Sequence, residues 1–325
     1  MLSPLSEKLP ENPRIIFMGT PEFAVPCFSA IYKAGYSILS VITQPDRPKG
    51  RGRKIISSPI KAEALKYGIP IMQPENLNDG EALSIIKKMS PDIFIVVAYG
   101  LILKQCVLSI PKFGSLNIHA SILPKYRGAA PINWAVFNNE KETGLSAMLL
   151  DEGMDSGDVV LTEKISVGPT ETAGQLYDRL MALSGTFILK VLDGLKAGVL
   201  TPAPQDERLV SFAPKITSNT VKIDWSNTAS EVSGRIRGLD PKPGATAVLN
   251  DTELKLFSSM LQKDKTDGLK PGFIHEVSSK GVEVATGEGS VLVRELQCPG
   301  KKRMPASEFI KGFNIRQGMM FTQQP

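Results

Sequence analysis

RIIFMG (residues 14–19) is an apolar run of six residues that ends at a glycine, and a helical pattern follows it over 21–34. Similar runs, rich in Ile and Val, recur as YSILSVIT (36–43), DIFIVVAYG (92–100) and SLNIHA (115–120). Such runs are typical of parallel strands that are buried on both faces. Because helical patterns separate them, residues 14–198 are predicted to form a doubly wound α/β domain with a mostly parallel sheet.

Glycine and proline mark the predicted helix ends. Four helices are predicted over 21–34, 59–67, 79–89 and 101–109, each stopped by a Gly or Pro that follows. Two strands are predicted within 143–167, on either side of an acidic loop. A longer helix follows, because Thr172 and Gln175 form a capping-box pattern and apolar residues then recur every three or four positions as far as Gly198.

The texture of the chain changes after residue 198. The Pro-rich stretch 199–214 is predicted to be a linker, and short strand patterns separated by Gly, Asp and Asn fill much of 215–325. This pattern predicts a second, smaller C-terminal domain, a β-barrel of the oligonucleotide-binding (OB) type, with a sandwich as the alternative. Two short helices are predicted near 228–238 and 305–312. Residues 1–13 lack a signal-peptide or transit-peptide pattern and are predicted to be a frayed leader.

Composition narrows the classes of function. The net charge is +5, and residues from Lys215 onward carry 16 Lys and Arg against 12 Asp and Glu, which weakly favours a polyanionic partner. Three scattered cysteines predict no disulfide framework and indicate a reducing, cytoplasmic location. With two histidines in the chain, a His-rich metal cluster is not expected. No apolar run approaches the roughly 20 residues of a membrane span.

The first strand-to-helix turn, FMGTPEF, invites a dinucleotide interpretation. The G-x-G-x-x-G fingerprint requires three glycines, and only Gly19 is present. The sequence therefore predicts a tight structural turn at this point and no NAD site.

A basic segment, PDRPKGRGRKI (45–55), follows the second predicted strand. It carries five cations among residues 47–54, namely Arg47, Lys49, Arg51, Arg53 and Lys54. The carboxyl edge of the sheet is where ligands bind in α/β domains, so a cationic loop there is suited to neutralising phosphates. A solvated charged loop without a ligand is the other interpretation, and both remain open at this point.

Two polar residues end the fourth predicted strand. Asn117 and His119 share one face of the strand because side chains alternate with a period of two. Polar groups on an apolar strand require partners, which are either backbone carbonyls in the core or a ligand at the end of the strand. The spacing by itself leaves both interpretations open.

The acidic loop DEGMDSGD (151–158) supplies a carboxylate, Asp155, that can serve His119 if the two meet. Its spacing does not match an EF-hand calcium loop. An amide, a titratable imidazole and an orienting carboxylate are suited to acyl transfer to an amine. Because no Ser or Cys nucleophile belongs to the group, direct transfer between two substrates is favoured over a covalent intermediate.

Six blocks in the chain resemble the methionyl-tRNA formyltransferase family, which uses 10-formyltetrahydrofolate. They are RIIFMGTPEFAVP (14–26), TQPDRPKGRGRK (43–54), VVAYGLIL (96–103), NIHASILPKYRGAAPI (117–132), MDSGDVV (154–160) and KIDWS (222–226). The Asn-x-His and D-x-G-D elements belong to all 10-formyltetrahydrofolate-using formyltransferases. The basic loop and the C-terminal barrel are the features that indicate the tRNA enzyme.

This resemblance implies a formyltransferase-like fold and direct attack of the methionyl α-amino group of initiator tRNA on the formyl group, through a tetrahedral intermediate. It implies that Asn117, His119 and Asp155 are catalytic, and that Ser121, Ile122, Leu123 and Pro124 line the folate site. It assigns Arg47, Lys49, Arg51, Arg53 and Lys54 to tRNA binding. The family commonly has Asn-Pro-Trp-Pro-Gly where this chain has DPKPG (240–244), so Lys242 removes the ring that could stack there.

Two alternatives remain. A formyltransferase acting on a sugar nucleotide or on glycinamide ribonucleotide would share Asn117, His119 and Asp155 without needing the basic loop. A non-catalytic tRNA-binding protein would use the barrel alone, but it would have no reason to keep the three polar groups. We expect a monomer that binds charged tRNA and the folate co-substrate, without a metal or a membrane.

Overall fold

The computed structural model describes residues 5, 7–49, 54–78, 80–262 and 268–322. Its contacts divide the chain into two units. The N-terminal unit comprises Met1–Gly128, Gly144–Ile165 and Asp178–Phe212. The C-terminal unit comprises Ala129–Thr143, Ser166–Tyr177 and Ala213–Pro325. Each unit is thus assembled from three segments of the chain.

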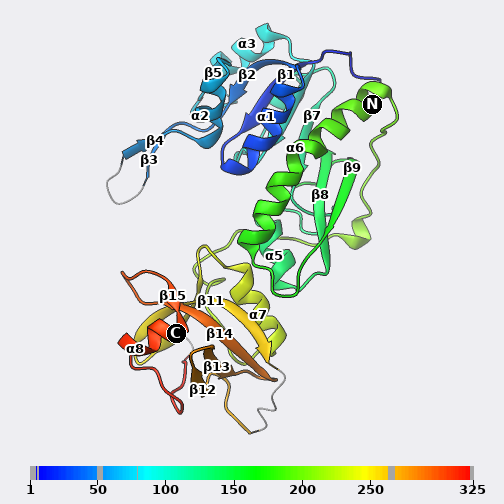
Figure 1. Cartoon of the computed structure of the whole chain (residues 1–325). Helices are drawn as coiled ribbons and strands as arrows, with labels where there is room; N and C mark the ends of the chain where they lie inside the picture. Colours follow the sequence, from blue (N-terminus) through cyan, green and yellow to red (C-terminus); the bar gives the residue numbers. More distant parts are fainter. Residues whose placement is uncertain (1–4, 6, 50–53, 79, 263–267, 323–325) are drawn as a thin grey trace. The chain divides into compact units, whose positions relative to one another are not determined.

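A seven-stranded sheet forms the centre of the N-terminal unit (Figure 1), in the order β5-β2-β1-β6-β7-β8-β9. Strands β1, β2, β5, β6 and β7 are parallel neighbours, and β8 is antiparallel to β7. The strands are β1 (Arg14–Gly19), β2 (Ser37–Ile42), β5 (Ile71–Met72), β6 (Ile93–Val97), β7 (Ser115–His119), β8 (Glu142–Leu149) and β9 (Val159–Ser166). The predicted doubly wound, mostly parallel sheet is confirmed.

The helices predicted over 21–34, 59–67 and 79–89 are found close to those bounds, whereas the helix predicted over 101–109 begins only at Gln105. In chain order, the helices as far as Ala197 are η1 (Glu22–Ala24), α1 (Val25–Lys33), α2 (Pro59–Lys66), α3 (Gly80–Met89), α4 (Gln105–Leu108), α5 (Pro131–Phe137) and α6 (Ala173–Ala197). The capping box of α6 is present, since Thr172 N donates to Gln175 Oε1 and Gln175 N donates to Thr172 Oγ1. Sequence analysis did not predict α5, although Pro131 at its first turn is a common start signal.

The basic segment differs from the predicted loop. Residues Arg47–Lys49 (β3) and Lys54–Ile56 (β4) pair as an antiparallel ribbon that stands off the body of the N-terminal unit (Figure 1). The pairing of β3 with β4 fixes the direction of both strands, and the Pro and Gly residues of the segment gave no sign of this pairing. Arg51 and Arg53 lie outside the described residues.

The predicted leader and linker both make contacts within the N-terminal unit. Leu5 and Leu9 are buried, and Leu9 N donates to the carbonyl of Leu195 in α6. Residues 199–212 belong to the N-terminal unit, and a short helix, η2 (Glu207–Leu209), lies within them. Phe212 forms a β-bridge with Arg127, so this segment lies against the loop that follows β7.

The C-terminal unit contains one antiparallel sheet in the order β10-β11-β14-β13-β12, with β15 beside β14. Its elements are α7 (Ala229–Gly238), β10 (Ala245–Leu249), β11 (Thr252–Gln262), β12 (Ile274–Ser278), β13 (Gly281–Ala285), β14 (Ser290–Gln297), β15 (Met304–Pro305) and α8 (Ala306–Gly312). Phe321 N donates to Gly272 O and Thr322 N to Val248 O, so the last residues bridge the two edges of the sheet. This closure agrees with the predicted small barrel.

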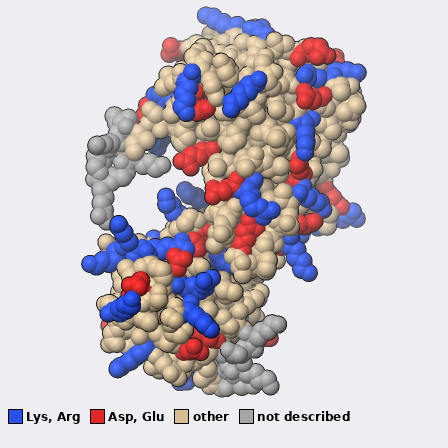
Figure 2. Space-filling view, viewed as in Figure 1, with Lys and Arg blue, Asp and Glu red and all other residues tan. Residues whose placement is uncertain are grey.

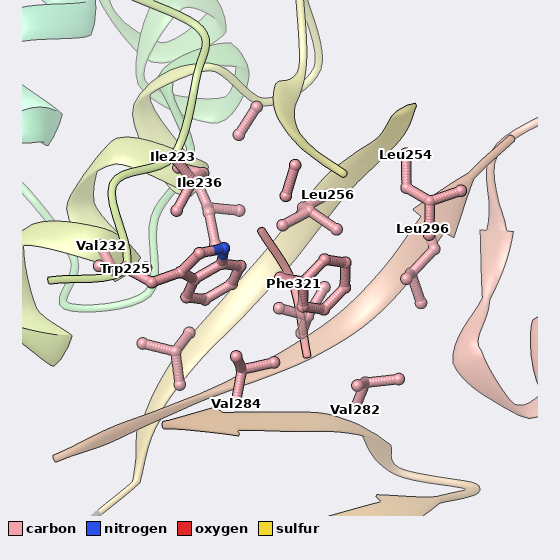
Figure 3. Close-up of a cluster of buried hydrophobic side chains, with 14 of the residues drawn as sticks. Ile223, Trp225, Val232, Ile236, Leu254, Leu256, Val282, Val284, Leu296 and Phe321 are labelled. Atoms are coloured by element: carbon pink, nitrogen blue, oxygen red, sulfur yellow. The ribbon is translucent and has the colours of Figure 1, made fainter. Parts of the chain in front are cut away.

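Buried aliphatic side chains fill this unit around one aromatic pair (Figure 3). The rings of Trp225 and Phe321 stack with centroids 5.3 Å apart, and each is 2% exposed. Val232 and Ile236 of α7 face the same cluster as Leu254 and Leu256 of β11. The C-terminal residues are therefore part of the core of this unit. None of the described helices in either unit has both the length and the apolarity needed to cross a membrane.

Candidate active site

The carboxyl end of β7 carries the candidate catalytic residues. Asn117 and His119 lie on this strand, where Asn117 pairs with Val96 of β6 and His119 with Ser146 of β8. The loop after β7 (120–130) begins at this end of the strand, whereas the loop after the antiparallel β8 (150–158) begins beside Ser115 and returns Asp155 to His119. Residues distant in sequence thus meet at one edge, as α/β ligand sites require.

His119 is 6% exposed, and the hydrogen-bond partner of one ring nitrogen shows which nitrogen carries the hydrogen. Nε2 lies 2.9 Å from the carbonyl oxygen of Tyr126, seven residues along the chain. A carbonyl can only accept, so Nε2 carries a hydrogen and donates it. The other nitrogen, Nδ1, is then the one that can exchange a proton with a neighbour.

Asp155 is the neighbour of Nδ1. Its Oδ2 lies 3.6 Å from His119 Nδ1, and the same oxygen accepts a 2.8 Å hydrogen bond from Gly128 N. A separation of 3.6 Å is an ion-pair distance and is too long for a direct hydrogen bond. The structure therefore brings Asp155 to His119, which the sequence pattern could not establish.

Asn117 is the third polar group. Its side chain is half-buried, and among the described residues no hydrogen bond to its amide is found. The amide of this half-buried side chain is therefore available to a ligand. Its placement on the same strand face as His119 directs both groups toward the same side of the sheet.

The predicted folate residues form a tightly held turn. Ser121 is fully buried, and its hydroxyl donates to the carbonyl of Lys125, so it serves the turn's own backbone. Ser146 of β8 donates to Ser121 O and accepts from Leu123 N, which fixes the turn from the neighbouring strand. Leu123 is buried, Ile122 and Pro124 are half-buried, and the Leu123–Pro124 peptide is cis.

Sequence reasoning missed several residues that organise this site. Arg127 is 5% exposed, and its guanidinium donates to the side chains of Gln205 and Glu207. Gln205 in turn donates to the carbonyls of Asp155 and Gly157. No local pattern marks these interactions, because they join segments about 50 to 80 residues apart.

The ribbon of basic residues is attached at its base by a polar cluster. Lys61 Nζ lies 2.5 Å from Asp46 Oδ2 and 2.6 Å from Gln73 Oε1, and Gln73 Nε2 donates to Asp46 Oδ1. Hydrogen bonds from Lys61 and Gln73 lower the pKa of Asp46, so this carboxylate stays charged beside the first residue of the ribbon. Arg47 is exposed, while the side chains of Lys49 and Lys54 lie outside the description.

In the C-terminal unit, exposed Lys and Arg side chains are numerous on the face seen in Figure 2. Lys242 is exposed between two cis peptides, Asp240–Pro241 and Lys242–Pro243. Asp240 is buried and forms a 2.6 Å ion pair with Arg303. This segment is thus held by a buried carboxylate and presents an exposed cation.

Comparison with known proteins identifies two family domains in the chain. Residues 13–192 match the formyl transferase family, and residues 215–314 match the formyl transferase C-terminal domain. Among the described residues, no cluster of His, Cys, Asp and Glu is arranged to hold a metal ion.

Curated relatives match nearly the whole chain. A methionyl-tRNA formyltransferase of Geobacter sulfurreducens is 43% identical over 305 residues, covering 94% of this chain and 95% of the relative. The methionyl-tRNA formyltransferase of Clostridium tetani is 43% identical over 308 residues, covering 94% and 99%. That of Pelotomaculum thermopropionicum is 41% identical, covering 94% and 98%.

Solved structures share the fold at low identity. An N-formyltransferase from Helicobacter canadensis, in complex with folinic acid and dTDP-3-aminofucose, superposes with a TM-score of 0.67 at 20% identity, covering 87% of this chain and 98% of that one. HypX from Aquifex aeolicus in complex with tetrahydrofolic acid gives 0.63 at 17% identity, covering 96% and 51%. Both domain matches and the full-length relatives agree, and this chain belongs to the methionyl-tRNA formyltransferase family of formyl-transferring enzymes.

Proposed function

We propose that this enzyme transfers the formyl group of 10-formyltetrahydrofolate to the α-amino group of methionine on charged initiator tRNA, with Asn117, His119 and Asp155 as its catalytic residues. The observation that carries the proposal is the meeting of His119 and Asp155 beside Asn117, in a chain whose full-length relatives carry that name. In the reaction, the methionyl nitrogen bonds to the formyl carbon, the bond from that carbon to N10 breaks, and one proton passes to N10.

Asn117 would bind the formyl oxygen. Model α-amino groups titrate at about 7.7–8.0, so part of the amine is already the neutral nucleophile near neutral pH. The harder task is to stabilise the negative charge that develops on the formyl oxygen. An amide N–H that has no partner among the described residues is suited to this, because it has no hydrogen bond to break before it donates to the formyl oxygen.

His119 would move the proton, and Nδ1 would be the nitrogen that does so. Nε2 is engaged with Tyr126 O, which leaves Nδ1 to face the reacting groups. Asp155 would hold the ring or a bridging water in register and stabilise the imidazolium when it forms, as a carboxylate does for the histidine of a hydrolase triad.

Ser121, Ile122, Leu123 and Pro124 would line the folate site mainly through their backbone and apolar side chains. The Ser121 hydroxyl is already bonded to Lys125 O, so we assign it to the shape of the turn. The turn follows His119 directly, which suits a donor whose formyl group must lie beside the imidazole. No metal takes part in this proposal.

The basic segment 45–55 would bind tRNA phosphates through Arg47, Lys49, Arg51, Arg53 and Lys54, and the C-terminal unit would add further cations. We also propose that the protein works in the cytoplasm, because Cys27, Cys106 and Cys298 are all free thiols. We further propose that it is a monomer. Sedimentation of the purified protein tests the oligomeric state.

A comparison of three acceptors, each given separately, tests the function. Purified protein is given 10-formyltetrahydrofolate with methionyl-tRNA, with an amino-sugar nucleotide, or with glycinamide ribonucleotide, and formyl transfer is measured. The proposal predicts transfer to methionyl-tRNA. Transfer to a small amine alone would support the alternative enzymes, and tRNA binding without transfer would support a non-catalytic protein.

A further inference from the structure

The side chain of Gln205 joins the catalytic loop to a buried arginine. Its Nε2 donates to the backbone carbonyls of Asp155 and Gly157, at 2.8 and 2.7 Å. Its Oε1 accepts from Nε and Nη2 of Arg127, at 3.0 and 2.9 Å. All four hydrogen bonds lie within the N-terminal unit.

We infer that Gln205 is a positioning residue, which acts through Asp155 and sets the distance from Asp155 Oδ2 to His119 Nδ1. This inference rests on the proposed function, because it assigns Gln205 a part in the same reaction. The hydrogen bonds of the Gln205 side chain go to Arg127 and to the loop after β8, so its effect on His119 would pass through the backbone of that loop.

The orientation of the Gln205 amide is determined by its partners. Arginine can only donate, and backbone carbonyls can only accept, so the oxygen must face Arg127 and the nitrogen must face the loop. The two ends of the amide therefore have separate tasks. A substitution that keeps the oxygen and removes the N–H donors will break one connection and leave the other.

The loop that Gln205 holds requires external support. Residues 150–158 belong to no helix or strand, and Asp155 has φ +50, in the left-handed region that costs a non-glycine residue free energy. The carbonyls of Asp155 and Gly157 are bonded to the same amide group. Gln205 thereby fixes the backbone from which the Asp155 carboxylate projects.

The same segment of chain also fixes the other side of the site. Ser211 Oγ accepts from Tyr126 N, and Ser211 O accepts from Arg127 N. Tyr126 O binds His119 Nε2, and Gly128 N binds Asp155 Oδ2. Residues 205–211 therefore contact both loops that hold the pair. Gln205 contacts the loop that carries Asp155, and Ser211 contacts the loop whose Tyr126 carbonyl binds His119.

Arg127 explains why a glutamine is suited to this position. The guanidinium is buried, and a buried cation requires hydrogen-bonding partners. Glu207 supplies the negative charge, and Gln205 satisfies Nε and part of Nη2 without adding a second charge. A neutral residue that both accepts and donates can serve Arg127 and the two carbonyls together.

The test compares Gln205→Glu with Arg208→Gln in the full-length enzyme. Gln205→Glu keeps the acceptor for Arg127 and removes both donors to the loop. Arg208 lies on the same segment and is exposed, and its guanidinium bonds to Asp206, two residues away. Gln205→Leu, which removes both connections, is the second variant if the charge in Gln205→Glu disturbs folding.

Two readouts are taken on each variant. The first is kcat and KM for formyl transfer to methionyl-tRNA. The second is the ¹⁵N spectrum of protein labelled only in its histidines, which contains two imidazole rings, His119 and His275. A His275→Gln variant assigns the two sets of signals.

We expect Gln205→Glu, which removes the two hydrogen bonds to the loop, to lower kcat at least about tenfold, since the loss of even one well-placed hydrogen bond is of this size, with KM changed less than about twofold. The ring signals of His119 should shift and those of His275 should stay, while Arg208→Gln leaves everything unchanged. Unchanged His119 signals, or an unchanged kcat, in both Gln205 variants would overturn the inference. If the unsubstituted enzyme fails to formylate methionyl-tRNA, the proposed function falls, and the histidine spectra still decide whether Gln205 positions this pair.

Discussion

Asp155 Oδ2 lies 3.6 Å from Nδ1 of His119, while the ring's other nitrogen donates to the carbonyl of Tyr126. The imidazole is thus held at one nitrogen and faces a carboxylate at the other. This arrangement leaves one defined position for proton transfer, and it is the basis for the roles proposed for both residues.

Removing the Asn117 amide should lower turnover and leave binding intact. Asn117→Ala should reduce the rate of formyl transfer by roughly 10²–10³, the usual cost of losing one oxyanion donor. The dissociation constant for methionyl-tRNA should not change. Single-turnover rates and filter binding measure the two quantities, and Asn76→Ala, at an exposed asparagine outside the site, is the control. An equal loss in both quantities would assign Asn117 to substrate binding.

Neutralising the β3–β4 ribbon should have the opposite effect. Replacing Arg47, Lys49, Arg51, Arg53 and Lys54 by Ala should weaken tRNA binding and make it less dependent on salt. The slope of log K against log salt should fall by roughly 0.7–0.9 for each phosphate that the ribbon no longer neutralises. The single-turnover rate at saturating tRNA should change little. Replacing the exposed Lys87 and Lys88 of α3 serves as the control. An unchanged affinity and slope would exclude the ribbon from tRNA binding.

The stacked pair in the C-terminal unit makes that unit depend on its last residues. Phe321→Ala should lower the free energy of unfolding of this unit by about 3–5 kcal/mol, the usual cost of truncating a buried phenylalanine. Both tryptophans, Trp134 and Trp225, lie in this unit, so Trp fluorescence in urea follows its transition. The neighbouring Met320→Ala, at a residue 38% exposed, should cost about 1 kcal/mol or less. Equal costs for the two variants would mean that the stack does not stabilise the unit.

The three cysteines should react with alkylating agents at different rates. Burial raises the pKa of the Cys27 thiol to about 12, so almost none of it is thiolate at pH 8. Because the pKa is raised, the reactive form becomes populated only as the pH approaches that value. Cys106 is exposed and should react first with iodoacetamide, and Cys27 only after unfolding. Mass spectrometry of the labelled peptides measures this order, and rapid labelling of Cys27 in the folded protein would contradict its burial.

The sheet strands and α6 were predictable because each has a local cause. RIIFMG and SLNIHA are apolar runs with clear ends, and the Thr172–Gln175 pattern starts a helix wherever an apolar face follows. The segment 47–56 was predicted as a loop because Pro and Gly within it suggested breaks, and no alternation of apolar residues marks the pairing of Arg47 with Ile56 or of Lys49 with Lys54. The short helix α5 was missed because the Gly- and Pro-rich stretch before it resembles a loop.

The sequence predicted the polar side chains of the candidate site but not the groups that hold them in place. Asn117, His119 and Asp155 are residue types that can take part in catalysis, and the period of two along a strand places Asn117 and His119 on one face. The groups that hold them are mostly backbone atoms, Tyr126 O and Gly128 N, which any residue type would supply. Gln205 and Arg127 stand 78 residues apart, and nothing local to either one predicts that they meet. Their roles depend on how distant loops meet in the folded unit.

The central claim is that the His119–Asp155 pair performs formyl transfer, and the most direct test is a single-turnover measurement on His119→Ala. Enzyme in excess over methionyl-tRNA is mixed with saturating 10-formyltetrahydrofolate, and formylmethionyl-tRNA is measured against time. We predict a rate at least about 10² below that of the unsubstituted enzyme, since positioned acid–base groups contribute about 10²–10⁴, with tRNA affinity retained. A variant that forms the product at the rate of the unsubstituted enzyme would contradict the claim.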